Sequence, residues 1–261
     1  MRPSLLAAAA ATATPLLIPL VLPGAACADE RRFTFTQEAP TAPKGAVEFE
    51  NWFTYKKARP DDSSFSRFEF RHELEYGLTD HVQVAFYLAD WSVTSGRSVE
   101  KDQAKYDDSA VEFKINYLDP AKDGFGLSSY HEVKLGDELF ELENKLILQK
   151  NFGPLVVAYN VTLEAVWEGH AYRERGGEFS QSLGLSYEVT PKFLIGAEAL
   201  HEIPLPDWTT SADSNFFLGP VASYRFGGDH DWWVTATALK QTTHNEGEAE
   251  WQVRVIVGFS F

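Results

Sequence analysis

From about residue 45 onward, hydrophobic and polar residues alternate along the chain. In the stretch 67–76 one face is apolar apart from His72, and the opposite face carries only charged residues, namely Arg67, Glu69, Arg71, Glu73 and Glu75. A period of two is typical of a β-strand, whose successive side chains point to opposite sides. Because an unpaired buried charge costs several kcal/mol, the charged face must meet water.

Twelve such segments follow one another. They cover residues 47–56, 67–76, 82–89, 111–117, 127–135, 141–148, 157–167, 179–187, 193–202, 216–226, 232–240 and 250–261. Short turns rich in Gly, Pro, Asp and Asn alternate with connections that are mostly longer and polar. The segment 232–240 is the weakest, because either of two sets can form its apolar face: Val234, Ala236 and Ala238, or Trp233, Thr235 and Thr237.

This organisation predicts an all-β fold, a closed antiparallel transmembrane β-barrel over residues 45–261, with twelve strands and with ten or fourteen as alternatives. Beyond the N-terminal stretch no run approaches the roughly 18 to 20 apolar residues of a membrane helix. A closed barrel is the other structure that satisfies every backbone group within lipid. A periplasmic β-sandwich also alternates, but the number of long strands and an aromatic content of 14% favour the barrel.

The N-terminus has the organisation of a secretory signal peptide. Arg2 precedes an apolar stretch over residues 5–22, and a small-residue pattern ends at Ala28, which predicts a signal over residues 1–28 and cleavage after Ala28. Lipidation of Cys27 is the alternative, because Gly-Ala-Ala precedes it. Residues 29–44 are expected to form a periplasmic lead-in, and the protein is expected in the bacterial outer membrane.

The formal net charge of −15 argues against a nucleic-acid partner. If the only cysteine leaves with the signal, the mature chain has neither a disulfide nor a thiolate metal site. No two histidines lie at ligand spacing, so neither a metal site nor a cofactor is predicted.

The charged positions opposite the apolar faces are expected to line the lumen. They are Glu48, Glu50, Arg67, Glu69, Arg71, Glu73, Glu75, Glu112, Lys114, Glu132, Lys134, Glu141, Glu143, Lys145, Glu164, Glu198, Arg225 and Arg254. One interpretation is a hydrated path, with carboxylates in excess, for small polar or cationic solutes. The other is a non-conducting structural or anchoring barrel filled by ion pairs. A short turn after Gly136 would place Lys134 opposite Glu141.

An enzymatic alternative rests on three residues of the outward face. Ser129 and His131 share that face of one strand, and the same turn places Asn144 opposite His131. These residues resemble the catalytic arrangement of outer-membrane phospholipase A, in which a histidine activates a serine and an amide orients the histidine. The resemblance implies an esterase. Here, however, the serine precedes the histidine, and the flanking residues do not match.

Two further resemblances concern the architecture. The final strand alternates and stops on Phe261, with Phe259 on the same face, which resembles the C-terminal signature of bacterial outer-membrane barrels. It implies recognition by the barrel-assembly machinery and contact with membrane lipid and lipopolysaccharide. The hairpin over residues 75–84 resembles outer-membrane proteins grouped under the MetA pathway of phenol degradation, which are presumed transporters.

Overall fold

The structure is a computed structural model that describes residues 30–97, 103–226 and 232–261. The predicted signal peptide, its cleavage site and Cys27 lie outside these residues. The strands are β1 Val47–Lys57, β2 Ser66–Thr79, β3 Val82–Ser95, β4 Gln103–Leu118, β5 Gly126–Gly136, β6 Leu139–Phe152, β7 Leu155–Glu168, β8 Glu174–Thr190, β9 Phe193–Leu205, β10 Asn215–Phe226, β11 Trp232–Gln241 and β12 Trp251–Ser260. A 3₁₀ turn, His170–Tyr172, follows β7.

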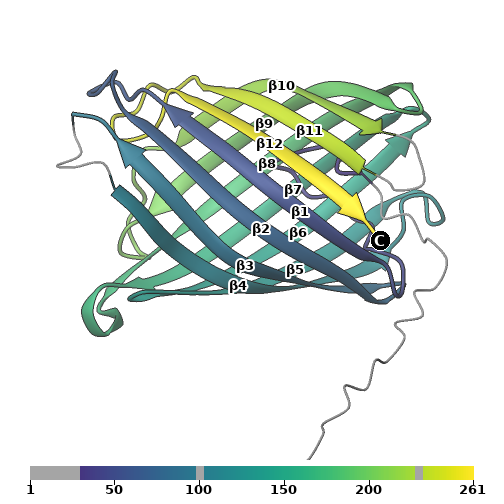
Figure 1. The fold of residues 1–261 in the computed structure, drawn as a ribbon, viewed down its shortest axis with the longest axis horizontal. Coiled ribbons are helices and arrows are strands. Elements are labelled where there is room, and N and C mark those ends of the chain that lie inside the picture. The colour runs from purple at the N-terminus through teal and green to yellow at the C-terminus, as the bar shows by residue number, and fades with distance from the viewer. Residues whose placement is uncertain (1–29, 98–102, 227–231) are drawn as a thin grey trace, which may run out of the picture.

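The twelve strands close into one barrel (Figure 1). Each strand pairs antiparallel with its neighbours in the chain, and β12 pairs with β1 from Glu48 opposite Ser260 to Lys57 opposite Trp251. Closure leaves none of the described strands with an unpaired edge. The predicted all-β fold and the count of twelve are therefore confirmed.

Among the described residues, no helix has the length and apolar character needed to cross a membrane.

The two faces of the wall differ as the alternation predicts. On β2, Phe68 is 47% exposed on the outer face, whereas Glu73 is fully buried on the inner face. In β11 the structure settles the open choice, because Trp233 is buried while Trp232 is exposed. The reason is local. Trp233 lies opposite Gly258 of β12, and its indole fills the space that a side chain there would need.

Residues 30–46, called here the N-terminal segment, lie inside the barrel at the end with the short turns. Phe33, for example, is buried against Val156 and Ala158 of β7 and Val221 of β10. At its end the segment meets β2, where Gly45 donates a backbone hydrogen bond to Gly77. None of these contacts follows from the alternating pattern of the strands, and the periplasmic location of this end stays a prediction.

The apolar outer wall makes one substitution diagnostic. Leu183 lies near the middle of β8 and is 39% exposed on the outer face. In lipid vesicles, Leu183→Arg should lower the free energy of unfolding by about 2–4 kcal/mol, because a guanidinium would face hydrocarbon. Denaturant unfolding would measure the change. Leu183→Ala, which removes bulk without adding charge, should cost less, and equal costs would contradict a lipid-facing position.

Candidate functional site

A cavity of about 770 Å³ occupies the barrel interior beside the N-terminal segment. All strands except β10 and β11 contribute to its lining, and Arg31 and residues 34–37 form part of its boundary. The basic residues that line it are Arg31, Lys56, Arg67, Arg71, Lys105, Lys134, Lys145 and Arg254. The acidic ones are Glu69, Asp90, Asp107, Asp108, Glu141, Glu143, Glu164, Glu168, Glu178 and Glu202. We call this space the inner cavity.

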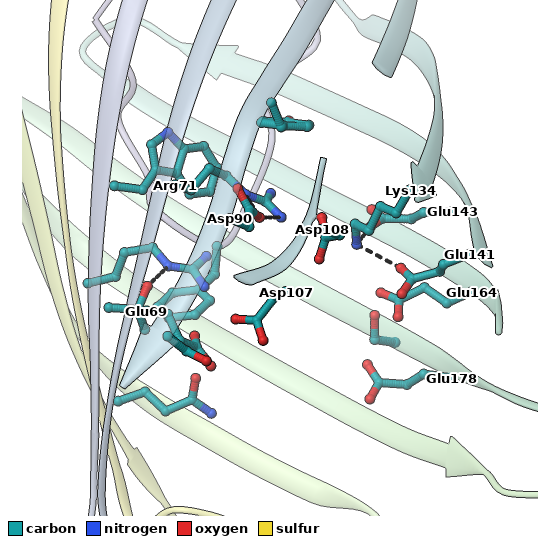
Figure 2. A pocket seen from close by; sticks show the side chains of 18 of the residues that line it. Glu69, Arg71, Asp90, Asp107, Asp108, Lys134, Glu141, Glu143, Glu164 and Glu178 are labelled. Carbon is teal, nitrogen blue, oxygen red and sulfur yellow. Dashed lines mark hydrogen bonds and ion pairs between the residues drawn. The ribbon is translucent and has the colours of Figure 1, made fainter. Parts of the chain in front are cut away.

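The charges of the inner cavity are divided between its two sides. One side, from β12, β1 and β2, carries the basic wall formed by Lys56, Arg67, Arg71 and Arg254. Within it Lys56 and Arg67 each pair with Glu69 at 3.0 Å, and Arg71 pairs with Asp90 at 2.6 Å. The other side, from β6 to β9, carries the acidic wall formed by Glu141, Glu143, Glu164, Glu178 and Glu202. In a ring of twelve strands β1 lies opposite β7, so the two walls face each other. Figure 2 shows Glu69 and Arg71 across the cavity from Glu164 and Glu178.

Part of the acidic wall belongs to a row of glutamates that crosses five strands. Successive members lie directly opposite one another in the strand register: Glu112, Glu132, Glu143, Glu164 and Glu178. Like charges at opposed positions destabilise a sheet. Barrel strands are tilted, so the row climbs the inner wall. Its first member lies six residues from the short-turn end of β4, and its last lies four residues from the loop end of β8.

In the part of the chain that the structure describes, only the first three glutamates of this row, Glu112, Glu132 and Glu143, have a neighbouring group that pairs with them. Glu112 accepts a hydrogen bond of 2.6 Å from the Tyr87 hydroxyl. Lys134 lies 3.2 Å from a carboxylate oxygen of Glu132 and 3.4 Å from one of Glu143. Lys145 lies 2.8 Å from the other oxygen of Glu143.

The upper part of the row has no such partner. Among the described residues, no basic group lies within ion-pair distance of Glu164 or Glu178, nor of Glu202 beside them. Within the described ranges, the two glutamates of the row without a pairing group, Glu164 and Glu178, therefore lie towards its loop end, on the acidic wall.

Three carboxylates of the acidic wall also lie close together. Oxygens of Glu141, Glu143 and Glu164 lie within 4.8 Å of one another. Lys134 bonds Glu141 at 2.7 Å, in the predicted register, so a basic group already contacts this cluster.

The remaining predicted inward residues lie elsewhere in the barrel. A second cavity of about 110 Å³, on the other side of the N-terminal segment, is lined by Glu48, Glu50, Glu75 and Lys114 among others. Arg31 reaches from the segment to Glu50 at 2.7 Å and to Glu75 at 2.8 Å, and it approaches Glu73 at 3.3 Å. Arg225 pairs with Glu30 at 3.0 Å.

Glu198 of β9 holds the N-terminal segment in place. Its carboxylate accepts backbone N–H bonds from three successive residues, Thr34, Phe35 and Thr36, at 2.9–3.0 Å. It also accepts a bond of 2.6 Å from the Thr237 hydroxyl. Arg254 donates to the Thr34 carbonyl at 3.1 Å. These bonds satisfy main-chain groups that a β-ladder would otherwise pair.

Inward amides continue this pattern along the segment. Gln37, Ala39 and Ala42 donate their backbone N–H groups to Asn160, Gln149 and Gln83, respectively. The ring of Phe33 lies over Gly184, where an added Cβ would come within 2.6 Å of it.

Glu198 was predicted to face the lumen, but its anchoring role and those of Asn160, Gln149 and Gln83 were not predicted. Two features of the sequence could have indicated them. Gly184 lies within a strand, and a glycine there often marks the close approach of another part of the chain. Asn160, Gln149 and Gln83 are amides at inward positions, many of which carry charged residues.

The candidate catalytic residues are brought together on the outer face. Asn144 lies opposite His131 in the β5–β6 register, as predicted. His131 Nδ1 lies 2.8 Å from Asn144 Oδ1, and His131 Nε2 lies 3.1 Å from Ser129 Oγ.

The two residues of the predicted assembly signal also contact each other. Phe259 and Phe261 pack edge to face with ring centres 4.6 Å apart. Their recognition by the assembly machinery stays a prediction.

Comparison with known proteins places the fold. The sequence profile of one family, described as Family of unknown function (DUF6662), matches residues 25–254. The COG4313 outer membrane channel from Pseudomonas putida F1 has a similar structure, with a TM-score of 0.64 and 15% sequence identity over 85% of this chain and 98% of that chain. The NanC porin has a TM-score of 0.52 and 10% identity, over 82% of this chain and 98% of that chain. No curated protein sequence matches the chain. The predicted fold resemblance to outer-membrane barrels is confirmed.

The contribution of Glu198 to anchoring the N-terminal segment can be measured by hydrogen exchange. Glu198→Gln keeps the shape but replaces one acceptor oxygen by a donor, so the backbone amides of Thr34, Phe35 and Thr36 lose part of their pairing. Their hydrogen-exchange protection should fall by about 10- to 100-fold, as expected for lost bonds to a charged group. Glu202→Gln, which changes a neighbouring cavity residue, is the control. Equal protection in the two variants would contradict the anchoring role.

Proposed function

The chain belongs to the family of unknown function DUF6662, which matches residues 25–254, and we propose that it is an outer-membrane channel for small cations and cationic polar solutes. The observation that carries the proposal is the acidic wall, where Glu164, Glu178 and Glu202 line the inner cavity. Uncompensated carboxylates along a confined aqueous space favour cations and repel anions.

The division of charge supports small polar solutes that carry a positive group. A cation in the inner cavity is attracted towards the unpaired carboxylates of the acidic wall. On the basic wall Lys56, Arg67 and Arg71 are paired with Glu69 and Asp90, so the repulsion there comes mainly from Arg254. A zwitterion would be oriented across the cavity. A cavity with charges of both signs therefore discriminates between solutes by the orientation of their charged groups as well as by their net charge.

Passage through the barrel also requires the N-terminal segment to move. Thr36 and Gln37 line both the inner cavity and the second cavity, so the segment stands between them. Several of its bonds are to side chains of the wall, such as Glu198 and Asn160, and not to a continuous strand. We therefore propose that the segment closes the path in this conformation and that its displacement opens the path.

The second candidate function is the non-conducting structural or anchoring barrel. It is favoured by the bonds that hold the N-terminal segment and by the burial of Phe33, which would keep the lumen filled. Conductance separates the candidates, because a permanently filled barrel carries no steady current.

Cation preference is the first measurable consequence. In planar bilayers, the combined variant Glu164→Gln, Glu178→Gln and Glu202→Gln should lower the cation-to-anion permeability ratio about twofold or more. These charges act over a Debye length of about 10 Å at 0.1 M salt. Reversal potentials in a salt gradient would report the ratio. The control removes three exposed carboxylates outside the inner cavity, Glu138, Glu174 and Glu246, and an equal loss there would contradict a role for the acidic wall.

The second measurable consequence of the proposal is that displacing the N-terminal segment opens the path. Gly184→Leu fills the space that the Phe33 ring occupies, and Phe33→Ala removes the ring, so both should unseat the N-terminal segment. Single-channel conductance should rise several-fold in both, with a smaller rise in Gly184→Ala. Gel migration with and without heating confirms that each barrel is folded. Absence of current in these variants and in the parent protein would overturn the channel in favour of the structural barrel.

A further inference from the structure

A hydrogen-bonded group of polar side chains interrupts the outer wall over β4, β5 and β6. Its core is Ser129, His131 and Asn144, called here the outer triad. Along β5 and β6 the other outward positions are mainly leucine and valine: Leu127, Val133, Leu135, Leu142, Leu146 and Leu148. Polar groups on a surface of this kind are costly unless they are paired. Here they pair with one another.

The bond geometry fixes how the protons are placed. The carbonyl oxygen of Asn144 can only accept, so His131 donates to it from Nδ1 at 2.8 Å. In the neutral imidazole Nε2 is then the acceptor, and the Ser129 hydroxyl donates to it at 3.1 Å. Ser129 Oγ is in turn left to accept from the Tyr117 hydroxyl, 2.9 Å away. Every bond agrees with a single tautomer.

We propose that the outer triad is a nucleophilic site for long-chain acyl esters that lie against the outer wall. Ser129 Oγ attacks the ester carbonyl carbon while His131 Nε2 takes its proton. His131 returns that proton to the departing alcohol, and the acyl group stays on Ser129. Water then attacks the acyl carbon, giving one proton to His131, which passes it to Ser129 as the fatty acid leaves.

Asn144 and Tyr117 complete the arrangement. Asn144 fixes the histidine tautomer and is a positioning residue. Tyr117, from the end of β4, donates its one hydroxyl hydrogen to Ser129 Oγ at rest, and after the attack it can turn that hydrogen to the carbonyl oxygen, where negative charge develops. A donor in that place stabilises the tetrahedral intermediate.

A second histidine–amide pair lies on the same outer wall and can be compared with the outer triad. His72 Nδ1 of β2 lies 2.8 Å from Asn51 Oδ1 of β1, which repeats the histidine–amide pair. Two residues before His72, however, the chain has Phe70, where β5 has Ser129. A histidine–amide pair by itself is thus a cross-strand contact of this wall. The serine on Nε2 distinguishes the outer triad.

The position of the outer triad suits an ester at the edge of the membrane. Ser129 lies three residues from the start of β5, and Tyr117 is next to the last residue of β4, both at the short-turn end. With a rise of about 3.3 Å per residue and a tilt of roughly 40°, Ser129 lies about 8 Å along the barrel axis from the strand end. An ester group bound at this level would have its acyl chains against the leucines of β5 and β6.

The test uses the full-length mature protein in mixed phosphatidylcholine–detergent micelles. We expect release of fatty acid, and covalent labelling of Ser129 by a fluorophosphonate, with loss of fluoride, located by mass spectrometry. Ser129→Ala should abolish both, and His131→Ala should lower the rate by about a hundredfold to ten-thousandfold. Tyr117→Phe should lower kcat with little change in KM.

Matched variants separate chemistry from folding. His72→Ala removes the histidine of the other pair and should leave hydrolysis unchanged. Asn144→Asp, which keeps the acceptor, should retain more activity than Asn144→Leu. The proposal is overturned if the parent protein releases no more fatty acid than Ser129→Ala, or if labelling of Ser129 persists undiminished in His131→Ala. Neither result bears on conductance, so the channel is tested separately.

Discussion

The rest of the structure depends on the closed backbone ladder, in which β12 pairs with β1 and every strand has two partners. Closure satisfies the main chain without water outside, which allows the outer wall to be apolar. Because side chains alternate along each strand, it also commits every second residue to the interior. The charges of β2 are therefore inside for the same reason that Phe68 and Phe70 are outside.

Closure creates an interior that contains many charged side chains. These charges are accommodated in three ways. Some pairs neutralise each other locally, as Lys134 and Glu141 do across the β5–β6 hairpin. Other wall groups are used by the N-terminal segment, whose Arg31 bonds Glu50 and Glu75 and whose backbone bonds Glu198. The remainder faces the inner cavity. Solvation is left to balance those charges of the inner cavity that have no ion pair among the described residues, such as Glu164 and Glu178, since desolvating them would cost several kcal/mol each.

The sequence predicts the features that depend on local pattern. Alternation and turn residues were enough for the twelve strands, and the two-residue turn after Gly136 set the β5–β6 register and thus the contact of His131 with Asn144. The inward position of Trp233 was not decided, because it depends on Gly258 of another strand. The N-terminal segment was missed for the same reason. Its partners, such as Asn160 and Glu198, lie more than a hundred residues away, and no local period reports them.

The glutamate row shows why register matters more than composition for this interior. An excess of acidic residues is visible in the sequence, but only the pairing of β4 to β8 places Glu143, Glu164 and Glu178 side by side. Opposed like charges weaken a sheet, and basic residues at these inward positions would have formed pairs instead. A wall that keeps its carboxylates adjacent and leaves the upper ones without ion pairs is stabilised when mobile cations or water screen them. The negative charges that repel one another within the row are therefore the same charges that would attract cations.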